Sequence, residues 1–337
     1  MTHTGDHSAA HTGAQTGRGV LCGAGAGALW GLVFLAPELV RDFNPLMLAA
    51  GRYLAYGVIA GVLILPRWRR LSGLLSGRDW RAVFLLSLAG NTLYYVLLSQ
   101  AVQSGGIALT SLIIGFLPVT VTVIGSRDQG AVPLKTLALS LGLCVAGVVC
   151  IGWQGLLGPQ ASGRTVQGML CAVGALVSWT AYAVGNSRCL SRLRHVSVHD
   201  WNLLTGVVTG AQAVVLVPFA LLAQKGPHSA EAWGRFAGVS VGVAILASMC
   251  GNALWNRMSR LLPLTMTGQM ILFETLFALL YGFLWEQRWP HPLELAAFGL
   301  VAGSVLSCVA VHRKHVPDPQ ASGPETPCQT EISGQGV

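Results

Sequence analysis

Ten apolar runs follow one another along this chain of 337 residues, and each has about the length of a helix that crosses a lipid bilayer. Such a helix needs about 20 consecutive apolar residues. Charged residues or turn-forming glycine and proline separate the runs. The sequence therefore predicts an all-α polytopic membrane protein with ten transmembrane helices. These lie near residues 18–38, 45–66, 80–101, 106–125, 133–153, 165–190, 201–224, 234–257, 264–285 and 292–312.

The charge content is too low for a soluble protein of this length. Only 10% of the residues are charged, whereas soluble domains average roughly 25%. The net charge is +8, but the Lys and Arg residues lie between the apolar runs and do not follow one face. We therefore expect the lipid bilayer as the partner of this chain and no nucleic acid. The sequence suggests no obligatory protein partner.

Both ends of the chain are polar, and residues 1–17 and 313–337 are predicted to be disordered tails. His3, His7 and His11 are four residues apart, so on a helix they could present metal ligands, but a disordered tail is the favoured interpretation. The eight cysteines form no CxxC pair. We therefore expect no metal and no cofactor.

The basic residues also predict an orientation. With both termini in the cytoplasm, the cytoplasmic segments hold fifteen Lys and Arg residues and the outer segments hold five. Cytoplasmic loops of membrane proteins carry such an excess of positive charge. The sequence therefore predicts that both termini are cytoplasmic.

Short motifs recur in the same order at offsets of about half the chain. "GNTLYY" at 90–95 matches "GNALWN" at 251–256, and Gly-Ala-Leu and Ala-Gly also occur in both halves. Because five spans per half is an odd number, the second half would enter the membrane from the opposite side, as in many secondary transporters. This predicts a five-helix repeat at 18–153, a loop at 154–164 and an inverted five-helix repeat at 165–312.

Aromatic and amide side chains form stripes on four of the predicted spans, at helical spacing. Because an asparagine facing lipid is costly, these stripes should point inward and line one central cavity. Packing between helices is the alternative for any single residue, and Trp255 could instead lie at the membrane interface. The candidate binding residues are Trp30, Asn91, Tyr94, Tyr95, Trp179, Tyr182, Asn186, Asn252, Trp255 and Asn256.

Two charged residues lie inside predicted spans. Glu274 is the only acid well within a span, so it could bind an ammonium group or carry a coupling proton. A structural acid bonded to Gln269 or Thr275 is the alternative. Arg52 is close enough to the outer surface to snorkel, which is favoured over binding a substrate carboxylate, although both stay open.

The ring faces and amides suit a zwitterion with an apolar or aromatic side chain. No histidine lies inside a span and the chain has no Walker A motif, which leaves facilitated diffusion or proton exchange through Glu274. An enzyme is not expected, because no HExxH motif and no aspartate deep in a span is present. A receptor or scaffold is also disfavoured, since neither needs a duplicated plan.

The region around Glu286, Ala302 and Gly303, "GFLWEQRWPHPLELAAFGLVAGSVL" at 282–306, resembles an EamA-type member of the drug/metabolite transporter superfamily. The Trp-x-x-Tyr motif followed by Asn in the sixth span, and Trp-Asn in the eighth, resemble more narrowly the YddG-type aromatic amino acid exporters. This resemblance implies a bacterial inner-membrane exporter of aromatic and other neutral amino acids that works by alternating access. The alternative is an exporter of cationic drugs or other small metabolites, with Glu274 as the counter-charge.

Overall fold

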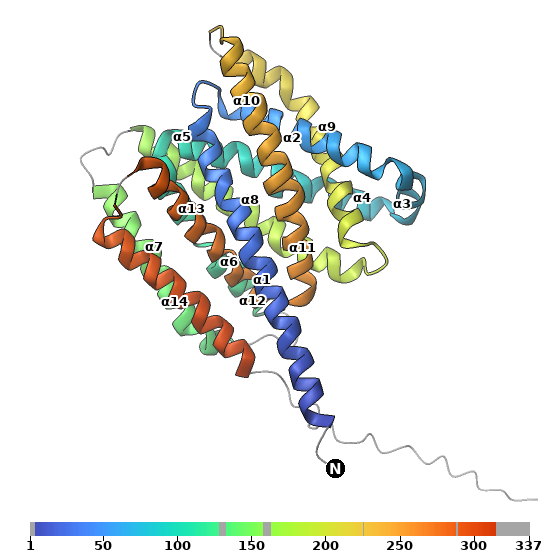
Figure 1. Ribbon diagram of the computed structural model, residues 1–337, viewed down its shortest axis with the longest axis vertical. Helices are drawn as coiled ribbons and strands as arrows, with labels where there is room; N and C mark the ends of the chain where they lie inside the picture. The colour runs from blue at the N-terminus through green and yellow to red at the C-terminus, as the bar shows by residue number, and fades with distance from the viewer. Residues whose placement is uncertain (1–3, 128–132, 158–162, 225, 288, 315–337) are drawn as a thin grey trace, which may run out of the picture.

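The computed structural model describes residues 4–127, 133–157, 163–224, 226–287 and 289–314, and within these ranges it contains helices and no strand (Figure 1). Among these residues, eight helices are long and apolar enough to cross a membrane. The all-helical membrane class predicted from the sequence is therefore confirmed at this level.

The helical elements follow the predicted apolar runs, with several runs divided into two or more pieces. The first half contains α1 (Thr4–Leu39), α2 (Pro45–Ile64), η1 (Leu65–Arg67), α3 (Trp68–Leu74), α4 (Gly77–Ser87), η2 (Leu88–Thr92), α5 (Leu93–Ile114), α6 (Leu117–Gly125) and α7 (Leu134–Leu157). The second half contains α8 (Gly163–Arg192), α9 (Val198–Ala223), α10 (Ala230–Val243), η3 (Ala244–Gly251), α11 (Asn252–Leu261), α12 (Leu264–Met270), α13 (Leu272–Glu286) and α14 (Pro292–Lys314).

The run predicted as one span at 106–125 is broken in the structure. Gly106 has a φ of 84°, so α5 is kinked there and its last turns belong to the next segment. The helix stops again after Ile114, and Pro118 lies in the first turn of α6. Proline has no backbone N–H to donate, which suits the start of a helix and not its middle. This segment is therefore two short helices.

The predicted tail at 1–17 differs from the structure, because α1 begins at Thr4 and continues into the first span without a break. Once a helix is nucleated, each added residue needs little further free energy, and alanines such as Ala9 and Ala10 favour extension. The predicted inter-repeat loop is also shorter, since α7 runs to Leu157 and α8 starts at Gly163. His3 and residues 315–337 lie outside the described part of the chain.

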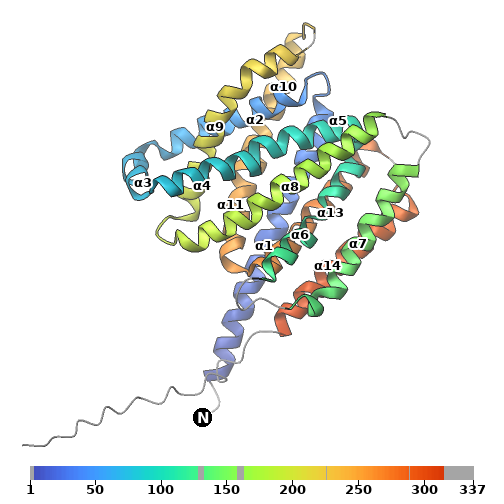
Figure 2. The same ribbon diagram turned by 180° about the vertical axis from the view of Figure 1, so that it is seen from behind.

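Helices from the two halves pack in pairs that join corresponding spans. α2 lies along α9, and α7 lies along α14, as two views from opposite sides show (Figures 1 and 2). The ends of the described chain, Thr4 in α1 and Lys314 in α14, lie at the same end of the molecule (Figure 1). Each half thus contributes one helix to each pair.

The α2–α9 pair crosses at two glycines, Gly57 and Gly210. A Cβ atom on Gly57 would lie 2.5 Å from the Cα of Gly210, and one on Gly210 would lie 2.6 Å from the Cα of Gly57. Without side chains the two backbones touch directly, which is how membrane helices gain dispersion energy in the absence of a hydrophobic driving force.

The α7–α14 pair is joined by two serines, Ser140 and Ser304, which bond to each other reciprocally. Ser140 Oγ donates to the Ser304 carbonyl at 2.9 Å, and Ser304 Oγ donates to the Ser140 carbonyl at 2.6 Å. Both hydroxyl groups are thereby satisfied at a position where lipid could offer no partner.

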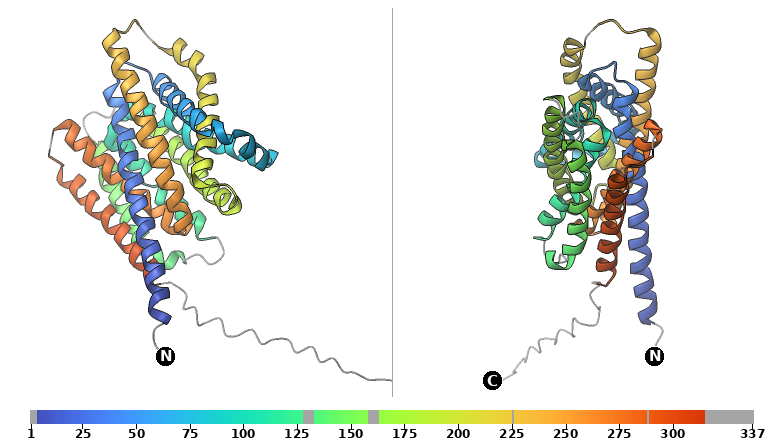
Figure 3. Two further views of the ribbon diagram at one scale, coloured as in Figure 1. Left: turned by 45° about the vertical axis from the view of Figure 1, so that its right-hand side comes forward. Right: turned by 90° about the vertical axis from the view of Figure 1, so that its left-hand side faces the viewer.

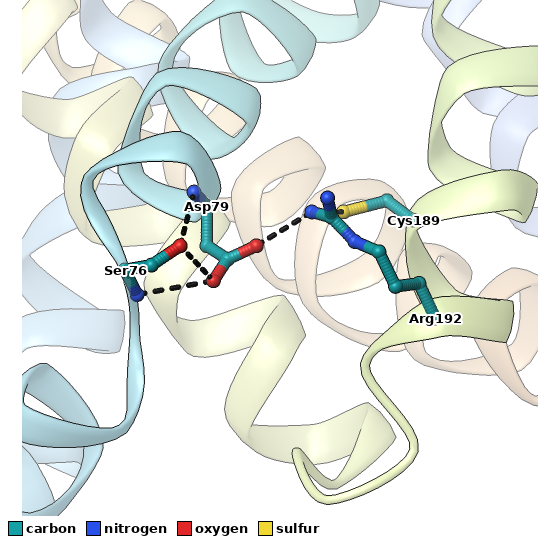
Figure 4. Close-up of polar contacts among 4 residues, drawn as sticks. All are labelled: Ser76, Asp79, Cys189 and Arg192. Carbon is teal, nitrogen blue, oxygen red and sulfur yellow. Dashed lines mark hydrogen bonds and ion pairs between the residues drawn. The ribbon is translucent and has the colours of Figure 1, made fainter.

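A contact near one end of the bundle also joins the two halves. Ser76 and Asp79 form a capping box at the start of α4, and the Asp79 carboxylate also binds Arg192 Nη2 of α8 at 2.5 Å (Figure 4). The Arg192 side chain is 41% exposed, so this ion pair is screened and contributes little free energy. Its role is to fix the start of α4 against the end of α8.

The glycine crossing predicts a specific loss of stability. Gly210→Ala should lower the free energy of unfolding by about 1–3 kcal/mol, because the new methyl group overlaps the α2 backbone. Thermal unfolding of the detergent-solubilised protein measures this. Gly61→Ala on α2 is the control, since a Cβ there meets no atom within 4 Å, and the better helix propensity of alanine should leave it neutral or slightly more stable. Equal destabilisation by both variants would contradict the account.

Candidate functional site

A small cavity lies at the centre of the bundle, where helices of both halves meet. About 20 Å³ of it is open to the centre of a water molecule, which is room for about one water. Its lining combines aromatic, amide and charged side chains. The lining residues are Trp30, Val33, Arg52, Tyr53, Gly90, Asn91, Tyr94, Trp179, Tyr182, Asn252 and Glu274.

Three tryptophans form the aromatic part of the site. Trp179 of α8 lies with its ring centre 5.6 Å from that of Trp30 and 5.1 Å from that of Trp255, in edge-to-face geometry with both. The rings of Tyr94 and Tyr182 lie 6.3 Å and 5.6 Å from the Trp179 ring. Such distances are favourable for aromatic pairs. Trp179 is therefore the hub of the cluster.

The repeated Gly-Asn motif makes room for an aromatic ring in each half. A Cβ on Gly90 would lie 2.3 Å from the ring of Tyr182, and one on Gly251 would lie 2.6 Å from Trp30 Nε1. Tyr182 and Trp30 are on α8 and α1, the first predicted span of each repeat. Only glycine therefore fits at either position, and this explains why the motif recurs.

The same motif coincides with π-helical turns, η2 at Leu88–Thr92 and η3 at Ala244–Gly251. A π turn widens the helix and changes its hydrogen-bond pattern, and such turns are frequent at functional sites. In η3, the Ala247 carbonyl accepts a hydrogen bond from Trp30 Nε1 at 3.0 Å. The π turn thus helps to hold one ring of the cluster, and Figure 3 shows α1 beside α10 and α11.

The amides that follow the two glycines, Asn91 and Asn252, both line the cavity. Asn91 Nδ2 donates to Thr209 Oγ1 of α9 at 3.1 Å, which fixes its orientation. Amide groups both donate and accept, so they can serve either end of a zwitterion.

The break between α12 and α13 at Ile271 places Glu274 in the first turn of α13. A helix N-terminus favours negative charge. The proposed partners do not bind it: Gln269 bonds to Ser140 and Ser304, and among the described residues Thr275 Oγ1 has no hydrogen-bond partner. Gln269 and Thr275 therefore do not bond to Glu274 in this structure, and its role stays a prediction.

Arg52 does not snorkel to the surface, which was the favoured interpretation from the sequence. It is 4% exposed, and its Nε donates to Ser248 Oγ of η3 at 3.0 Å. Position along α2 misled the prediction, because Arg52 lies on the face that packs into the bundle. Arg52, Tyr53, Val33 and Gly90 line the cavity but were not among the ten predicted binding residues. From the sequence, Arg52 is a charge inside a span, with binding of a carboxylate as the less favoured alternative.

Four predicted residues lie outside the cavity lining. Asn186 and Asn256 bond to each other, Nδ2 to Oδ1, at 3.0 Å, and Asn186 Oδ1 also accepts from Trp201 Nε1 at 2.8 Å. Trp255 is buried in the tryptophan cluster and does not lie at the membrane interface. Tyr95 lies beneath the Arg52 guanidinium, whose Cζ is 4.2 Å from its ring centre. These residues support the site from behind, whereas Trp30, Asn91, Tyr94, Trp179, Tyr182, Asn252 and Glu274 line it.

A much larger recess, about 570 Å³, lies on the outside of α4 and α9. Its lining, which includes Trp68, Phe84 and Phe219, is almost entirely apolar. Its polar lining residues, Thr92 and Gln212, bond to each other at 2.7 Å, so the recess lacks the several converging polar groups that orient a polar ligand. The small central cavity is therefore the candidate site, despite its size.

The fold and the site define a class: a helical membrane protein made of two related halves that meet at a buried aromatic and polar site. The sequence model of the EamA-like transporter family matches residues 17–153 and again 166–309, so the chain contains two EamA repeats. The chain belongs to the EamA-like transporter family.

Two relatives and one solved structure are similar over much of the chain. The inner membrane protein YtfF of Escherichia coli (strain K12) is 32% identical over 94% of this chain and 98% of its own. An uncharacterized transporter of Archaeoglobus fulgidus is 26% identical over 58% of this chain and 64% of its own. A crystal structure with 18% identity has a TM-score of 0.65 over 88% of this chain and 98% of its own, which shows the shared fold.

Asn186 lies outside the cavity lining, so its replacement should lower the stability of the protein without changing which ligand the protein binds. Asn186→Ala leaves Trp201 Nε1 buried without a partner and should lower the free energy of unfolding by about 1–3 kcal/mol. Thermal unfolding of Asn186→Ala, Trp201→Phe and the double variant measures the coupling. The double variant should lose less than the sum of the two single variants. Additive losses, or a changed ligand preference in a stable Asn186→Ala protein, would contradict a packing role.

Proposed function

We propose that this protein is an inner-membrane transporter that exports aromatic and other neutral amino acids. The observation that carries the proposal is the cavity between the halves, where the rings of Trp30 and Trp179 meet the amides of Asn91 and Asn252. Rings hold an apolar or aromatic side chain, and amides hold the polar end of the molecule. Membership in a transporter family and similarity to an inner membrane protein support the same function.

The proposed transporter has ten membrane spans in two inverted five-helix repeats, and both of its termini are in the cytoplasm. Eight helices are long enough by themselves, α7 supplies another crossing, and the broken segment Ile107–Gly125 supplies the tenth. The contacts of Gly57 with Gly210 and of Ser140 with Ser304 support a two-fold relation between the halves, because each joins residues of the same type on the paired helices of the two halves. Substrate sites of such transporters lie between the repeats near the bilayer midplane.

We take the described conformation as one in which the central cavity is closed to substrate. Room for about one water is far less than any amino acid occupies, so substrate binding requires the helices around the cavity to separate. Alternating access would open the cavity first to the cytoplasm and then to the outside. Similarity within the family, and not the geometry, is the basis for export as the direction.

Export of cationic drugs is the second candidate, and Glu274 is the observation that favours it. A cation would gain from the buried acid and from the ring faces. Arg52 lines the same cavity and would repel the same cation. The presence of both charges therefore favours a molecule without net charge.

Transport by purified protein in liposomes tests the function. The wild type should take up L-tryptophan and L-phenylalanine saturably and should not take up tetraphenylphosphonium. Trp179→Leu removes the hub ring while it keeps an apolar side chain, and should weaken tryptophan transport about tenfold, the equivalent of one aromatic contact. Trp285→Leu, at a half-exposed position near the end of α13, is the control and should have no effect. Uptake of the cation alone would favour the second candidate.

A further inference from the structure

Two ionisable side chains of opposite type, one from each half, are buried at the central cavity. Arg52 of α2 is 4% exposed and Glu274 of α13 is 3% exposed, and both line the cavity. Charged side chains inside a membrane protein are costly unless they are paired or bind a ligand. Their surroundings therefore decide which of these applies.

The Arg52 guanidinium is held in place by one hydrogen bond and two aromatic rings. Its Nε donates to Ser248 Oγ at 3.0 Å, and its Cζ lies 4.2 Å and 4.9 Å from the ring centres of Tyr95 and Tyr53. Its Nη1 has no hydrogen-bond partner within the described part of the chain. A fixed guanidinium with an unused donor is suited to receive a carboxylate.

Glu274, like Arg52, has a buried side-chain atom without a hydrogen-bond partner among the described residues. Its Oε2 has no hydrogen-bond partner among the residues that the structure describes, and neither has the hydroxyl of Tyr94, which lines the same cavity. The ion pairs of the described residues join other groups, so Arg52 and Glu274 do not neutralise each other by direct contact. Arg52 and Glu274 therefore line the same cavity without forming an ion pair with each other.

We propose that Arg52 binds the α-carboxylate and Glu274 binds the α-ammonium of the transported amino acid. The rings of Trp30 and Trp179 then receive its side chain. This inference rests on the proposed function and adds the orientation of the substrate to it. A zwitterion satisfies both unpaired groups at once, whereas any ligand with a single charge leaves one of them buried without a partner.

The clamp formed by Arg52 and Glu274 restricts the substrates to molecules that carry both a carboxylate and an ammonium group. A site with buried polar groups strongly rejects an analogue that lacks the matching group. Amines without a carboxylate would leave Arg52 unpaired, and acids without an ammonium group would leave Glu274 unpaired. The substrates should therefore be free α-amino acids.

Equilibrium binding to the full-length protein in nanodiscs tests the clamp with three probes of the same ring system: L-tryptophan, tryptamine and indole-3-propionate. The wild type should bind tryptophan about tenfold or more tightly than either analogue, because each analogue forfeits a charge-assisted hydrogen bond. This comparison needs no variant, so it decides the question even where a variant fails to fold.

Two variants assign each charge to one end of the ligand. Arg52→Gln should weaken tryptophan about tenfold or more and leave tryptamine unchanged or tighter, and Glu274→Gln should do the same with indole-3-propionate in place of tryptamine. Arg52→Lys keeps the charge and should restore part of the tryptophan affinity. Thermal unfolding of each variant shows that it is folded.

The outcomes separate the clamp from the proposed function. If the wild type binds tryptophan and both analogues alike, or if Arg52→Gln weakens tryptophan and tryptamine equally, the clamp is wrong while amino acid transport stands. If the wild type binds no neutral amino acid at all, the proposed function fails and the clamp fails with it. The crossed pattern of losses in the two variants is the result that the clamp predicts.

Discussion

The absence of water from the bilayer core is the constraint on which this structure depends, because every buried polar group must find its partner within the protein. The chain meets much of this demand by hydrogen bonds between and within its two halves. Ser140 and Ser304 bond to each other, and Asn186, Asn256 and Trp201 form a closed network. Arg52 and Glu274 each keep an atom without a partner, and both lie at one cavity. The cavity thereby combines two ionisable side chains that each keep an unpartnered atom among the described residues, which separates the candidate site from the serine and asparagine contacts that hold helices together.

Small residues let the two halves approach closely enough to form that site. Gly57 and Gly210 remove the side chains where α2 crosses α9. Gly90 and Gly251 do the same for the rings of Tyr182 and Trp30, which enter the space that a Cβ would occupy. The π turns η2 and η3 at the same motif widen each helix where the amide of Asn91 or Asn252 must reach the cavity. A repeated six-residue motif thus builds equivalent walls of one site.

Hydropathy was sufficient to predict the class of fold. The helical spacing of amide and aromatic side chains, together with the recurring Gly-Asn motif, identified most of the residues that line the cavity. This spacing could not tell which asparagine faces the cavity. Asn91 and Asn186 both lie on polar stripes, yet Asn186 accepts a hydrogen bond from Trp201 Nε1 at 2.8 Å and does not line the cavity, which only the three-dimensional structure reveals. Arg52 was assigned by its distance from the helix start, which says nothing about the face it occupies. The break at Gly106 and the helix from Thr4 were also missed, since hydropathy does not report backbone breaks or helix extension past the membrane.

Access to the central cavity is the most direct test of a shared site between the halves. In a protein whose native cysteines are replaced, Asn91→Cys and Asn252→Cys should react with a membrane-impermeant thiol reagent, and L-tryptophan should slow both reactions. Val58→Cys, on the exposed apolar face of α2, should not react. Reaction of both cavity positions with protection by substrate is the predicted result. If neither cavity position reacts from either side of the membrane, the two walls belong to a closed core and the account is contradicted.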